Sequence, residues 1–367
     1  MRLLYLTDRL SHRGGAQHHL LDVIRAMSKR HTVSIAAAAI DGEVRLPPGA
    51  VFHKVSGLRS GVSQDKGLQD LPSLLGDADC VHVQNVMNPR ALTMVTSQPC
   101  VVTVQDHRIF CPGPGRTLPS GRQCDLPMGE QACAQCLDQK DYRHRMLALT
   151  AERREAIASA SQVVVLSNYM AAELRAAGLD RVTIIPPPVD PGPPRTIPGN
   201  GFLIAGRIVQ HKGSDLAVDA WKLSGTEHPL LVAGLGPLAS EINPTEHLGW
   251  LSRPALRRAM GTARGVLFPA RWQEPFGIVG VEALAMGTPV IAMGTGGMAD
   301  WSDAGTIVVA PGDVKAMAAA IHDLSCDDPG ALRLGSAGAA MVRDRYQESI
   351  LTDRLDQIYS KAASCST

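Results

Sequence analysis

Short apolar runs without polar alternation recur along the chain, separated by longer segments with helical spacing. After the first run, for example, Leu20, Ile24 and Met27 recur at helical intervals. Continuously apolar runs are typical of parallel strands that helices cover on both faces. The predicted strands are Arg2–Thr7, Thr32–Ile40, Cys80–Val83, Val101–Gln105, Val163–Ser167, Phe202–Ala205, Leu230–Ala233, Gly265–Phe268, Pro289–Ala292 and Thr306–Val309. The pattern therefore predicts an α/β protein with doubly wound parallel sheets.

The apolar runs form two groups on either side of a proline-rich stretch. Residues 186–198 are dense in proline and are typical of a linker. A chain of 367 residues is too long for one ordinary core and sufficient for two. We predict a Rossmann-like domain over residues 1–190, a second over residues 191–345, and a C-terminal helix over residues 346–367 that packs back on the first domain. Because such sheets bind ligands at the carboxyl ends of their strands, we expect the domains to face a cleft.

Charge and apolar content narrow the class of protein. The formal net charge of +1 gives no case for a nucleic-acid partner. The apolar N-terminus is broken by Asp8 and Arg9, as in a strand and unlike a signal peptide. No run approaches the roughly 18 apolar residues of a transmembrane helix. We therefore expect a cytoplasmic protein whose cysteines are thiols or metal ligands rather than disulfides.

A basic loop follows the predicted strand Phe202–Ala205. It presents Arg207 and Lys212, and a helix is predicted to begin near Ser214. The free N–H groups and the dipole at a helix start favour anions, and two cations could neutralise a diphosphate without a metal ion. A solvated basic loop would explain the same residues, and this alternative stays open.

Two glutamates follow in the next conspicuous segment. Glu274 lies in a predicted loop, and Glu282 lies within a predicted helix whose first N–H groups belong to Gly277, Ile278 and Val279. Those groups would form a second anion site. Ionised carboxylates accept hydrogen bonds from sugar and ribose hydroxyls, so two of them near one ligand suggest hydroxyl recognition. The alternative is one surface glutamate and one that favours the helix dipole.

The ordered set of motifs resembles one family. The shared features are Gly14-Gly15, Gly206-Arg207, Lys212-Gly213, Gly234 with Gly236, Gly249-Trp250-Leu251, Glu274, Pro275-Phe276-Gly277, Glu282, Gly287-Thr288-Pro289-Val290 and Gly296-Gly297. The whole chain resembles the retaining GT-B glycosyltransferases, the group 1 or family 4-like enzymes related to glycogen and sucrose synthases. The resemblance implies two Rossmann-like domains and a metal-independent transfer of a sugar from a UDP- or GDP-sugar, with retention of configuration.

The resemblance also implies roles for the matching residues. The first domain is expected to bind the acceptor and the second the donor. Arg207 and Lys212 would hold the diphosphate and stabilise the leaving group. Glu282 would bind the ribose and Glu274 hydroxyls of the transferred sugar, so Arg207, Lys212 and Glu274 are catalytic candidates. The backbone amides of Gly15, Ile278 and Val279 are implied to contact the diphosphate, and the region around Gly249 and Leu251 is implied to border the base. Gly14, Phe276 and Gly277 complete the implied donor-binding set.

The sequence departs from the family at the end of the strand Val101–Gln105. Many relatives carry His-Asp there, whereas this chain has Gln105 followed by Asp106 and His107. Glutamine can hydrogen-bond a sugar hydroxyl but cannot titrate, so we keep Gln105 as a catalytic candidate and expect an altered donor preference. His107 is interpreted as a structural residue.

A cysteine-rich loop occupies residues 110–137. It is rich in glycine and proline and lacks the apolar periodicity needed to fold unaided. A C-x2-C pair with two further cysteines matches tetrahedral ligation of a structural zinc ion. Disulfides or four unrelated thiols are the alternatives. The four residues are Cys111, Cys124, Cys133 and Cys136.

The acceptor leaves no recognisable motif, so a glycan, a lipid-linked molecule and a small molecule all stay open. A basic segment, Lys140–Arg154, would either contact an anionic membrane at its inner face or form a solvated helix face. A peripheral membrane contact is thus one of two interpretations.

Two other functions fit a pair of Rossmann-like domains. A sugar-nucleotide epimerase would consume donor without an acceptor, and a non-catalytic subunit would bind a nucleotide sugar without turnover. A dinucleotide oxidoreductase is disfavoured because Gly14-Gly15 lacks the G-x-G-x-x-G spacing. The ordered set of two cations and two glutamates favours a transferase.

Overall fold

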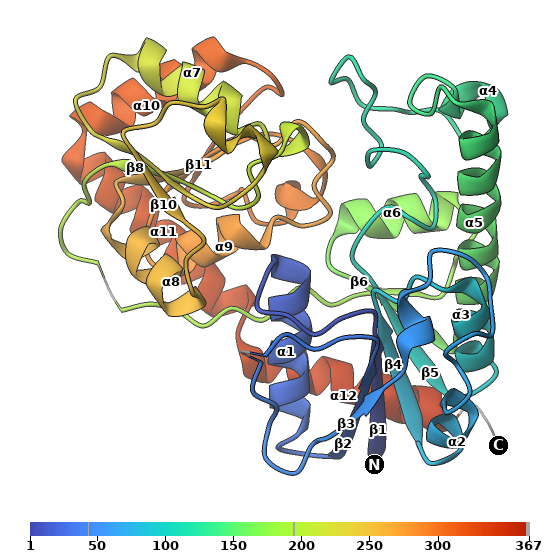
Figure 1. The fold of residues 1–367 in the computed structure, drawn as a ribbon. Coiled ribbons are helices and arrows are strands. Elements are labelled where there is room, and N and C mark those ends of the chain that lie inside the picture. Colours follow the sequence, from blue (N-terminus) through green and yellow to red (C-terminus); the bar gives the residue numbers. More distant parts are fainter. Residues whose placement is uncertain (43, 194, 365–367) are drawn as a thin grey trace. The chain divides into compact units, whose positions relative to one another are not determined.

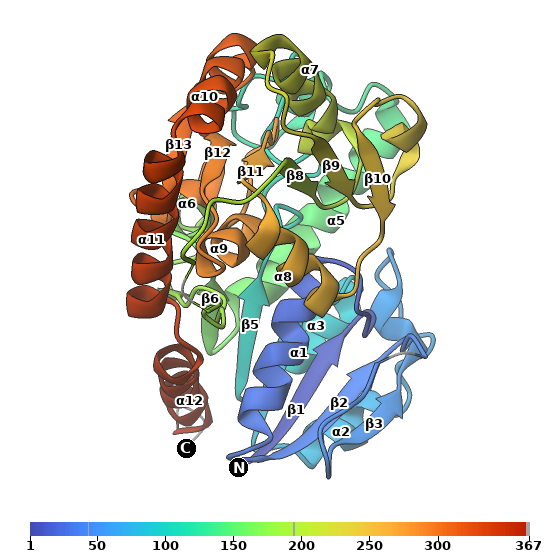
Figure 2. The same cartoon turned by 90° about the vertical axis from the view of Figure 1, so that its left-hand side faces the viewer.

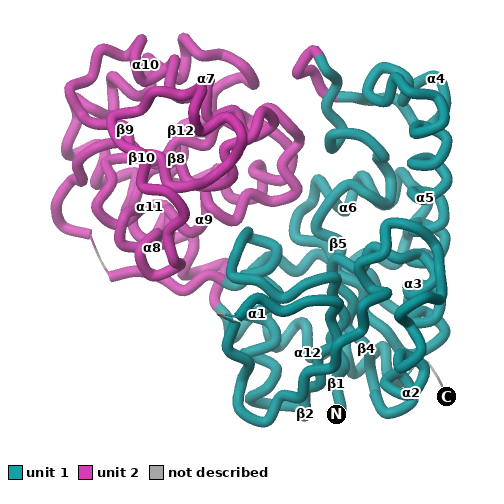
Figure 3. Tube along the Cα trace, in the orientation of Figure 1, with its two compact units in different colours: residues 1–119, 124–188, 348–367 teal, residues 120–123, 189–347 magenta. Residues whose placement is uncertain are grey.

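The computed structural model describes residues 1–42, 44–193 and 195–364 and divides into two compact units. Unit 1 comprises residues 1–119, 124–188 and 348–367, and unit 2 comprises residues 120–123 and 189–347 (Figure 3). Each unit contains its own parallel sheet, as the brief apolar runs predicted. The long stretches of the chain change unit at Pro188 and at Gln347, close to the predicted limits at 190 and 345.

Unit 1 is built on a seven-stranded sheet in the order β3-β2-β1-β4-β5-β6-β7, and all neighbours pair in parallel. The strands are β1 (Arg2–Thr7), β2 (Thr32–Ala37), β3 (Val51–Lys54), β4 (Cys80–Gln84), β5 (Cys100–Val104), β6 (Gln162–Val165) and β7 (Val182–Ile184). The first strand lies in the middle, where Leu3 pairs with Val33 on one side and with Cys80 on the other.

Helices cover both faces of this sheet. The helices of unit 1 are α1 (Gly15–Met27), α2 (Leu71–Gly76), α3 (Pro89–Thr96), α4 (Glu130–Cys133), α5 (Lys140–Ala158), α6 (Asn168–Ala176) and α12 (Glu348–Ser364), with a 3-10 turn η1 (Ser56–Arg59). The short α4 lies in the cysteine-rich loop and does not cover the sheet. Alternate side chains of β1 point to opposite faces: Leu3 and Tyr5 pack with α1 and α12, whereas Leu4 and Leu6 pack with α2, α3, α5 and α6 (Figure 1, Figure 2).

Unit 2 repeats the architecture with a six-stranded parallel sheet in the order β10-β9-β8-β11-β12-β13. Its strands are β8 (Phe202–Ala205), β9 (Leu230–Ala233), β10 (Glu246–Gly249), β11 (Gly265–Phe268), β12 (Val290–Met293) and β13 (Thr306–Val309). Its helices are α7 (Ser214–Ser224), α8 (Arg253–Thr262), α9 (Ile278–Ala285), α10 (Val314–Cys326) and α11 (Asp328–Arg345), with 3-10 turns η2 (Gln210–Lys212), η3 (Pro237–Ser240) and η4 (Gly296–Asp300). Apolar residues of β8 and β12 pack with α7 and α10 in one buried cluster.

Three strands escaped prediction, and all three are edge strands. In β3, β7 and β10 every residue is at least partly exposed, because each has a neighbour on one side only. An edge strand can therefore be polar and short, and it lacks the continuously apolar run that marked the central strands.

Candidate functional site

The basic loop of unit 2 joins β8 to α7 through a glycine in the left-handed region. Gly213 has φ 70° and caps the start of α7, and a Cβ atom there would lie 2.0 Å from the carbonyl oxygen of Pro269. Only glycine fits this position, and it turns the chain from η2 into the helix. Arg207 is exposed, and Gly213, the N-cap residue of α7, has no side chain to bond to the first N–H groups of the helix. The Asp215 carboxylate lies in the first turn and pairs with Arg271. The loop thus presents an exposed guanidinium beside an open helix start.

Lys212 and Glu274 meet in this loop. The Lys212 Nζ lies 2.6 Å from Glu274 Oε2, and the Trp272 Nε1 donates to the same oxygen at 2.6 Å. The ammonium group also lies 4.9 Å from the centre of the Trp272 ring, within range of a cation–π contact. Because Glu274 is only 8% exposed, the carboxylate is held by two donors in a largely dry setting.

His211 joins the two loops that carry these residues. Its carbonyl oxygen accepts from the backbone N–H groups of Arg271 and Trp272, and its ring lies 4.7 Å from that of Trp272. Burial lowers the pKa of His211 to about 4, and the charges of Lys212 and Arg207 add to this effect. The imidazole is therefore neutral at pH 7, and within the described residues its buried Nε2 has no hydrogen-bond partner.

The second glutamate lies on α9 and faces the start of α8. The Arg253 Nε lies 3.3 Å from Glu282 Oε1, and Glu282 is 5% exposed. Arg253 follows the turn at the end of β10, where Gly249 has φ 65° and Leu251 is partly buried. The structure therefore brings Glu282 toward the segment around Gly249 that was predicted to border the base.

The start of α9 is open to an anion. Gly277 caps the helix with φ 89° and has no side chain to bond to its first N–H groups, and Ile278 and Val279 are partly exposed. The ring of Phe276 is 1% exposed and packs against Tyr346. Its side chain is therefore part of the core, and only its backbone is available to a ligand.

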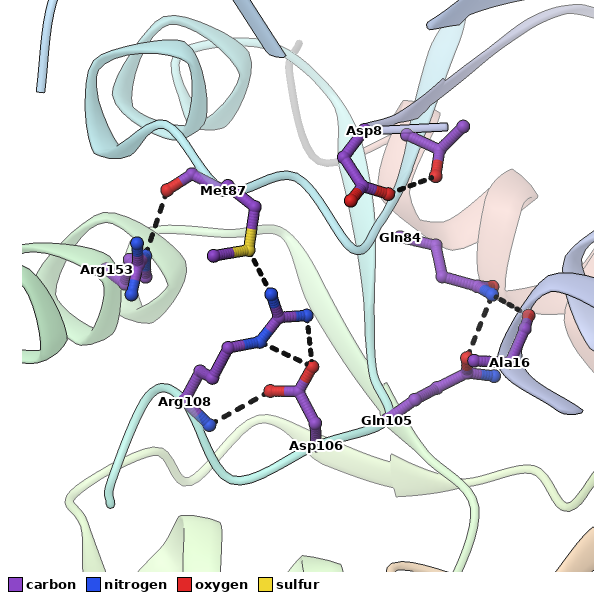
Figure 4. A network of polar contacts seen from close by, with 9 residues as sticks. Asp8, Ala16, Gln84, Met87, Gln105, Asp106, Arg108 and Arg153 are labelled. Carbon is purple, nitrogen blue, oxygen red and sulfur yellow. Dashed lines mark hydrogen bonds and ion pairs between the residues drawn. The ribbon is translucent and has the colours of Figure 1, made fainter. Parts of the chain in front are cut away.

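Gln105 lies at the carboxyl end of β5 in unit 1, within a buried polar network (Figure 4). Its Oε1 accepts from Gln84 Nε2 at 2.9 Å, and its Nε2 contacts His19 Nδ1 on α1. The Gln84 Nε2 also donates to the Ala16 carbonyl at 2.7 Å, beside the Gly14-Gly15 turn where Gly14 has φ 105°. Burial lowers the pKa of His19 to about 4, so the network is neutral at pH 7.

Comparisons with known proteins agree with this geometry. Residues 13–192 match the family model described as Glycosyltransferase Family 4, and residues 199–327 match the model described as Glycosyl transferases group 1. The chain belongs to the group 1, family 4-like glycosyltransferases. Glycogen synthase of Mycobacterium tuberculosis is 28% identical over 212 residues, which are 52% of this chain and 51% of that protein.

Other similar proteins extend the comparison. A D-inositol 3-phosphate glycosyltransferase of Xylanimonas cellulosilytica is 28% identical over 249 residues, 57% of this chain and 59% of that one. The matches thus span about half the length of these curated relatives. The crystal structure of HepE from Anabaena, in complex with UDP and glucose, superposes with a TM-score of 0.72 over 98% of this chain and 99% of that chain, at 16% identity. The predicted GT-B fold is confirmed.

The cysteine-rich loop brings its four predicted thiols to one cavity of about 380 Å³, which Cys111, Cys124, Cys133 and Cys136 help to line. All four are free and partly buried, and burial raises the pKa of Cys133 and Cys136, with smaller contributions from neighbouring cysteines. Among the described residues, however, no three His, Cys, Asp or Glu side chains are placed to hold one metal ion. The residue types fit zinc, but their present positions do not form a ligand set.

The basic segment forms α5 and is less basic at its surface than the sequence indicated. Arg143 is 9% exposed and pairs with Glu130, and Arg153 is 3% exposed and donates to the Met87 carbonyl at 2.9 Å. Two of the five cations therefore point into unit 1, and the membrane interpretation gains no support. In the described part of the chain, no helix combines the length and the apolar content that a membrane crossing requires. The cytoplasmic location stays a prediction.

Sequence reasoning missed four residues that contact the predicted set. They are His19, which contacts Gln105, and Arg253, which pairs with Glu282. Trp272 donates to Glu274 and lies beneath the Lys212 ammonium group, and the ring of His211, the residue before Lys212, packs against Trp272. His211 and Trp272 stand within two positions of a predicted residue, and that proximity was an available signal. His19 and Arg253 approach from other elements, so only the fold reveals them. His107 is 3% exposed and contacts the Tyr169 hydroxyl at 3.1 Å, which agrees with its structural interpretation.

Proposed function

We propose that this glycosyltransferase moves a sugar from a UDP- or GDP-sugar to an acceptor with retention of configuration, and that unit 2 binds the donor. The observation that carries the proposal is the clustering, within unit 2, of Arg207, the Lys212–Glu274 pair and two helix starts without side-chain caps. Loops that follow β8 and β11 supply these groups, at the carboxyl ends of neighbouring parallel strands where α/β sheets bind ligands.

The charges suit a leaving nucleoside diphosphate. Negative charge develops on the diphosphate as the sugar departs, and fixed cations and helix N–H groups stabilise it without a catalytic metal ion. Lys212 would then share its charge between Glu274 and the diphosphate. In this proposal Glu274 binds hydroxyls of the sugar, while Glu282 and Arg253 lie toward the ribose. The structure of HepE with UDP and glucose makes a UDP-sugar a reasonable first donor to test.

The acceptor and its class are part of the same proposal. A glycan, a lipid-linked molecule or a small molecule would bind to unit 1, in which Gln105 lies at the carboxyl edge of the sheet. Turnover of a radiolabelled UDP-sugar separates the alternatives. A transferase needs an acceptor to release UDP stoichiometrically, an epimerase converts the donor alone, and a binding subunit leaves it unchanged.

The cationic loop is tested with the double variant Arg207→Ala/Lys212→Ala. We expect it to abolish transfer and the thermal stabilisation by UDP, because each charge-assisted contact contributes about 1.5–3 kcal/mol. The control is Lys222→Ala/Arg258→Ala, which removes the same charge from exposed positions of unit 2. Wild-type affinity for UDP in the first variant would contradict the assignment, as would loss of activity in a chelator that only magnesium or manganese restores.

The two glutamates are expected to bind different parts of the donor, so their roles can be distinguished by the ligand used. Glu282→Ala should weaken binding of UDP itself, whereas Glu274→Ala should leave UDP binding nearly intact and lower affinity for the intact sugar donor and the rate of transfer. Isothermal titration with UDP and with the UDP-sugar measures both. The opposite pattern would mean that the two roles are exchanged.

A further inference from the structure

A cavity in unit 1 contains a buried arginine, Arg153, that forms no ion pair among the described residues. The cavity has a volume of about 400 Å³ to its open mouth and lies at the carboxyl ends of β4 and β5. Its polar lining residues are Asn85, Thr103, Gln105, Asp106, Arg108 and Arg153, of which Thr103 already contacts His82. They come from the two strand ends and from α5, so elements distant in sequence converge on one small space.

Arg153 is the unexplained residue of this cavity. Its side chain is 3% exposed, and its Nε donates to the Met87 carbonyl at 2.9 Å (Figure 4). Among the described residues, its two Nη atoms have no hydrogen-bond acceptor, and no carboxylate lies within ion-pair distance. Burial, and then the charge of Arg108, lowers the pKa of Arg153, yet a guanidinium keeps its proton at any physiological pH. Such a buried charge is costly unless something pairs with it.

Arg108 carries the second guanidinium of the cavity. It is fixed to Asp106, with Nε 2.8 Å from Asp106 Oδ2, and its Nη1 points at the sulfur of Met87 (Figure 4). Burial alone would raise the pKa of Asp106, but the charge and hydrogen bonds of Arg108 outweigh burial and hold that pKa below its usual range. A thioether is a weak acceptor, so this Nη1 could exchange it for an oxyanion.

Charge and donors in the cavity suit an oxyanion. Arg108 forms an ion pair with Asp106 and also interacts with the charge of Asp8. Arg153 forms no ion pair among the described residues, and the charges of Asp106 and Glu152 act on it only at longer range. Asn85 is held at φ 60° and lines the cavity, and its amide forms no hydrogen bond within the described residues. Forked N–H groups match the paired oxygens of phosphates and carboxylates.

We propose that this cavity binds an oxyanion, a phosphate ester or a carboxylate, carried by the acceptor. The assignment to the acceptor rests on the proposed function, because the donor is placed in unit 2 and Gln105 lines this cavity in unit 1. The cavity would thereby select acceptors that carry an anionic group near the hydroxyl that is glycosylated.

The test measures anion binding without turnover. Thermal unfolding of the full chain is followed in potassium phosphate, potassium acetate and potassium chloride at equal ionic strength. The background is Arg207→Ala/Lys212→Ala, so that phosphate bound at the proposed donor loop does not contribute. Phosphate or acetate at ten times its dissociation constant should raise Tm by about 3 °C over chloride. A rise in Tm with phosphate alone would indicate that the acceptor carries a phosphate ester. A rise with acetate alone would indicate that it carries a carboxylate.

Arg153→Met should abolish that increment and leave Tm in chloride unchanged or higher, because the variant removes an unpaired buried charge. If Arg153 had only a structural role, Arg153→Met would instead lower the Tm in chloride. Arg153→Lys, which keeps the charge but not the fork, should bind the anion more weakly. The matched control is the neighbouring Arg154→Met, which should behave as the parent.

Two results would overturn the proposal. The first is a Tm in phosphate and in acetate that is no higher than the Tm in chloride. The second is a rise in Tm with phosphate or acetate that persists in Arg153→Met. Failure of the proposed function has a different signature, since UDP would then fail to stabilise the chain with an intact donor loop. Arg153→Met in that chain should retain its full response to UDP.

Discussion

At the scale of single residues, the candidate site pairs charges that the sequence presents separately. Lys212 and Glu274 are 62 positions apart and form an ion pair of 2.6 Å, with Trp272 donating to the same carboxylate. Removing Lys212 would leave the buried Glu274 carboxylate with Trp272 but without its counter-charge, so stability and ligand binding must be measured together. Burial also affects the charge of two histidines, His19 and His82, whose side chains lie almost fully inside unit 1.

Acid should weaken the fold through these histidines. Burial lowers the pKa of His19 to about 4 and that of His82 to about 3, below the 6.5 of an ordinary histidine. The unfolded chain therefore binds more protons, and the stabilisation is complete above pH 6.5 and declines as the pH falls toward 4. For His19 the loss reaches up to about 3 kcal/mol.

Urea unfolding of the wild type and of His19→Asn between pH 7.5 and pH 4 measures this effect. The variant should lose less free energy of unfolding over that range, because asparagine does not titrate. His247→Asn, at an exposed position of β10, is the control. An equal decline in wild type and His19→Asn would mean that His19 is charged in the folded protein.

At the scale of elements, glycines open the helix starts that face the proposed donor. Gly213 and Gly277 both have positive φ and cap α7 and α9 without a side-chain bond. A polar cap would occupy the N–H groups that an anion needs, so a glycine cap keeps the site available.

Gly213→Ala and Gly225→Ala separate backbone conformation from close contact. The two glycines bound α7, with φ 70° and φ 65°, but a Cβ at Gly225 meets nothing within 4 Å while one at Gly213 lies 2.0 Å from the Pro269 carbonyl. We expect Gly225→Ala to cost about 1–2 kcal/mol and Gly213→Ala clearly more, with loss of UDP binding. Urea unfolding and thermal shift with UDP measure both, and equal costs would show that the contact with Pro269 is relieved easily.

The cysteine-rich loop is predicted to hold one zinc ion per chain. Its four thiols line one cavity in a segment whose only helix is the short α4, and ligation would require side chains to turn inward. Elemental analysis after purification without chelator should find zinc, and Cys133→Ser/Cys136→Ser should lose it and become sensitive to protease within residues 110–137. Cys326→Ser, an exposed thiol of α10, should keep it. A zinc-free protein whose loop resists protease would contradict the prediction.

At the scale of the whole molecule, the last helix completes the first unit. Residues Leu351, Leu355 and Tyr359 of α12 join the buried cluster of β1 and α1, across the full length of the chain. Inside this cluster the Tyr359 hydroxyl contacts the Tyr5 hydroxyl at 3.0 Å and the His82 imidazole. Unit 1 therefore depends on residues that follow the whole of unit 2 in the sequence.

Deleting residues 348–367 should prevent stable folding of unit 1, because it uncovers one face of the sheet. The milder Tyr359→Phe should lower the free energy of unfolding by about 1–3 kcal/mol, since it leaves two buried polar groups without their partner. Tyr142→Phe, at an exposed position of α5, is the control. Native urea unfolding of the truncated chain would show that α12 is dispensable.

The sequence by itself determined the two parallel sheets and the loops that carry the candidate site, because central strands must be apolar on both faces and glycines are required where φ is positive. Both ends of β8 and the starts of α7 and α9 followed from such local rules. Three of the four edge strands were missed, since a strand with one neighbour needs no apolar run. Only the tertiary structure brought Arg253 to Glu282 and placed Arg153 in the lining of a cavity in unit 1. Burial and pairing of side chains depend on which distant elements pack together.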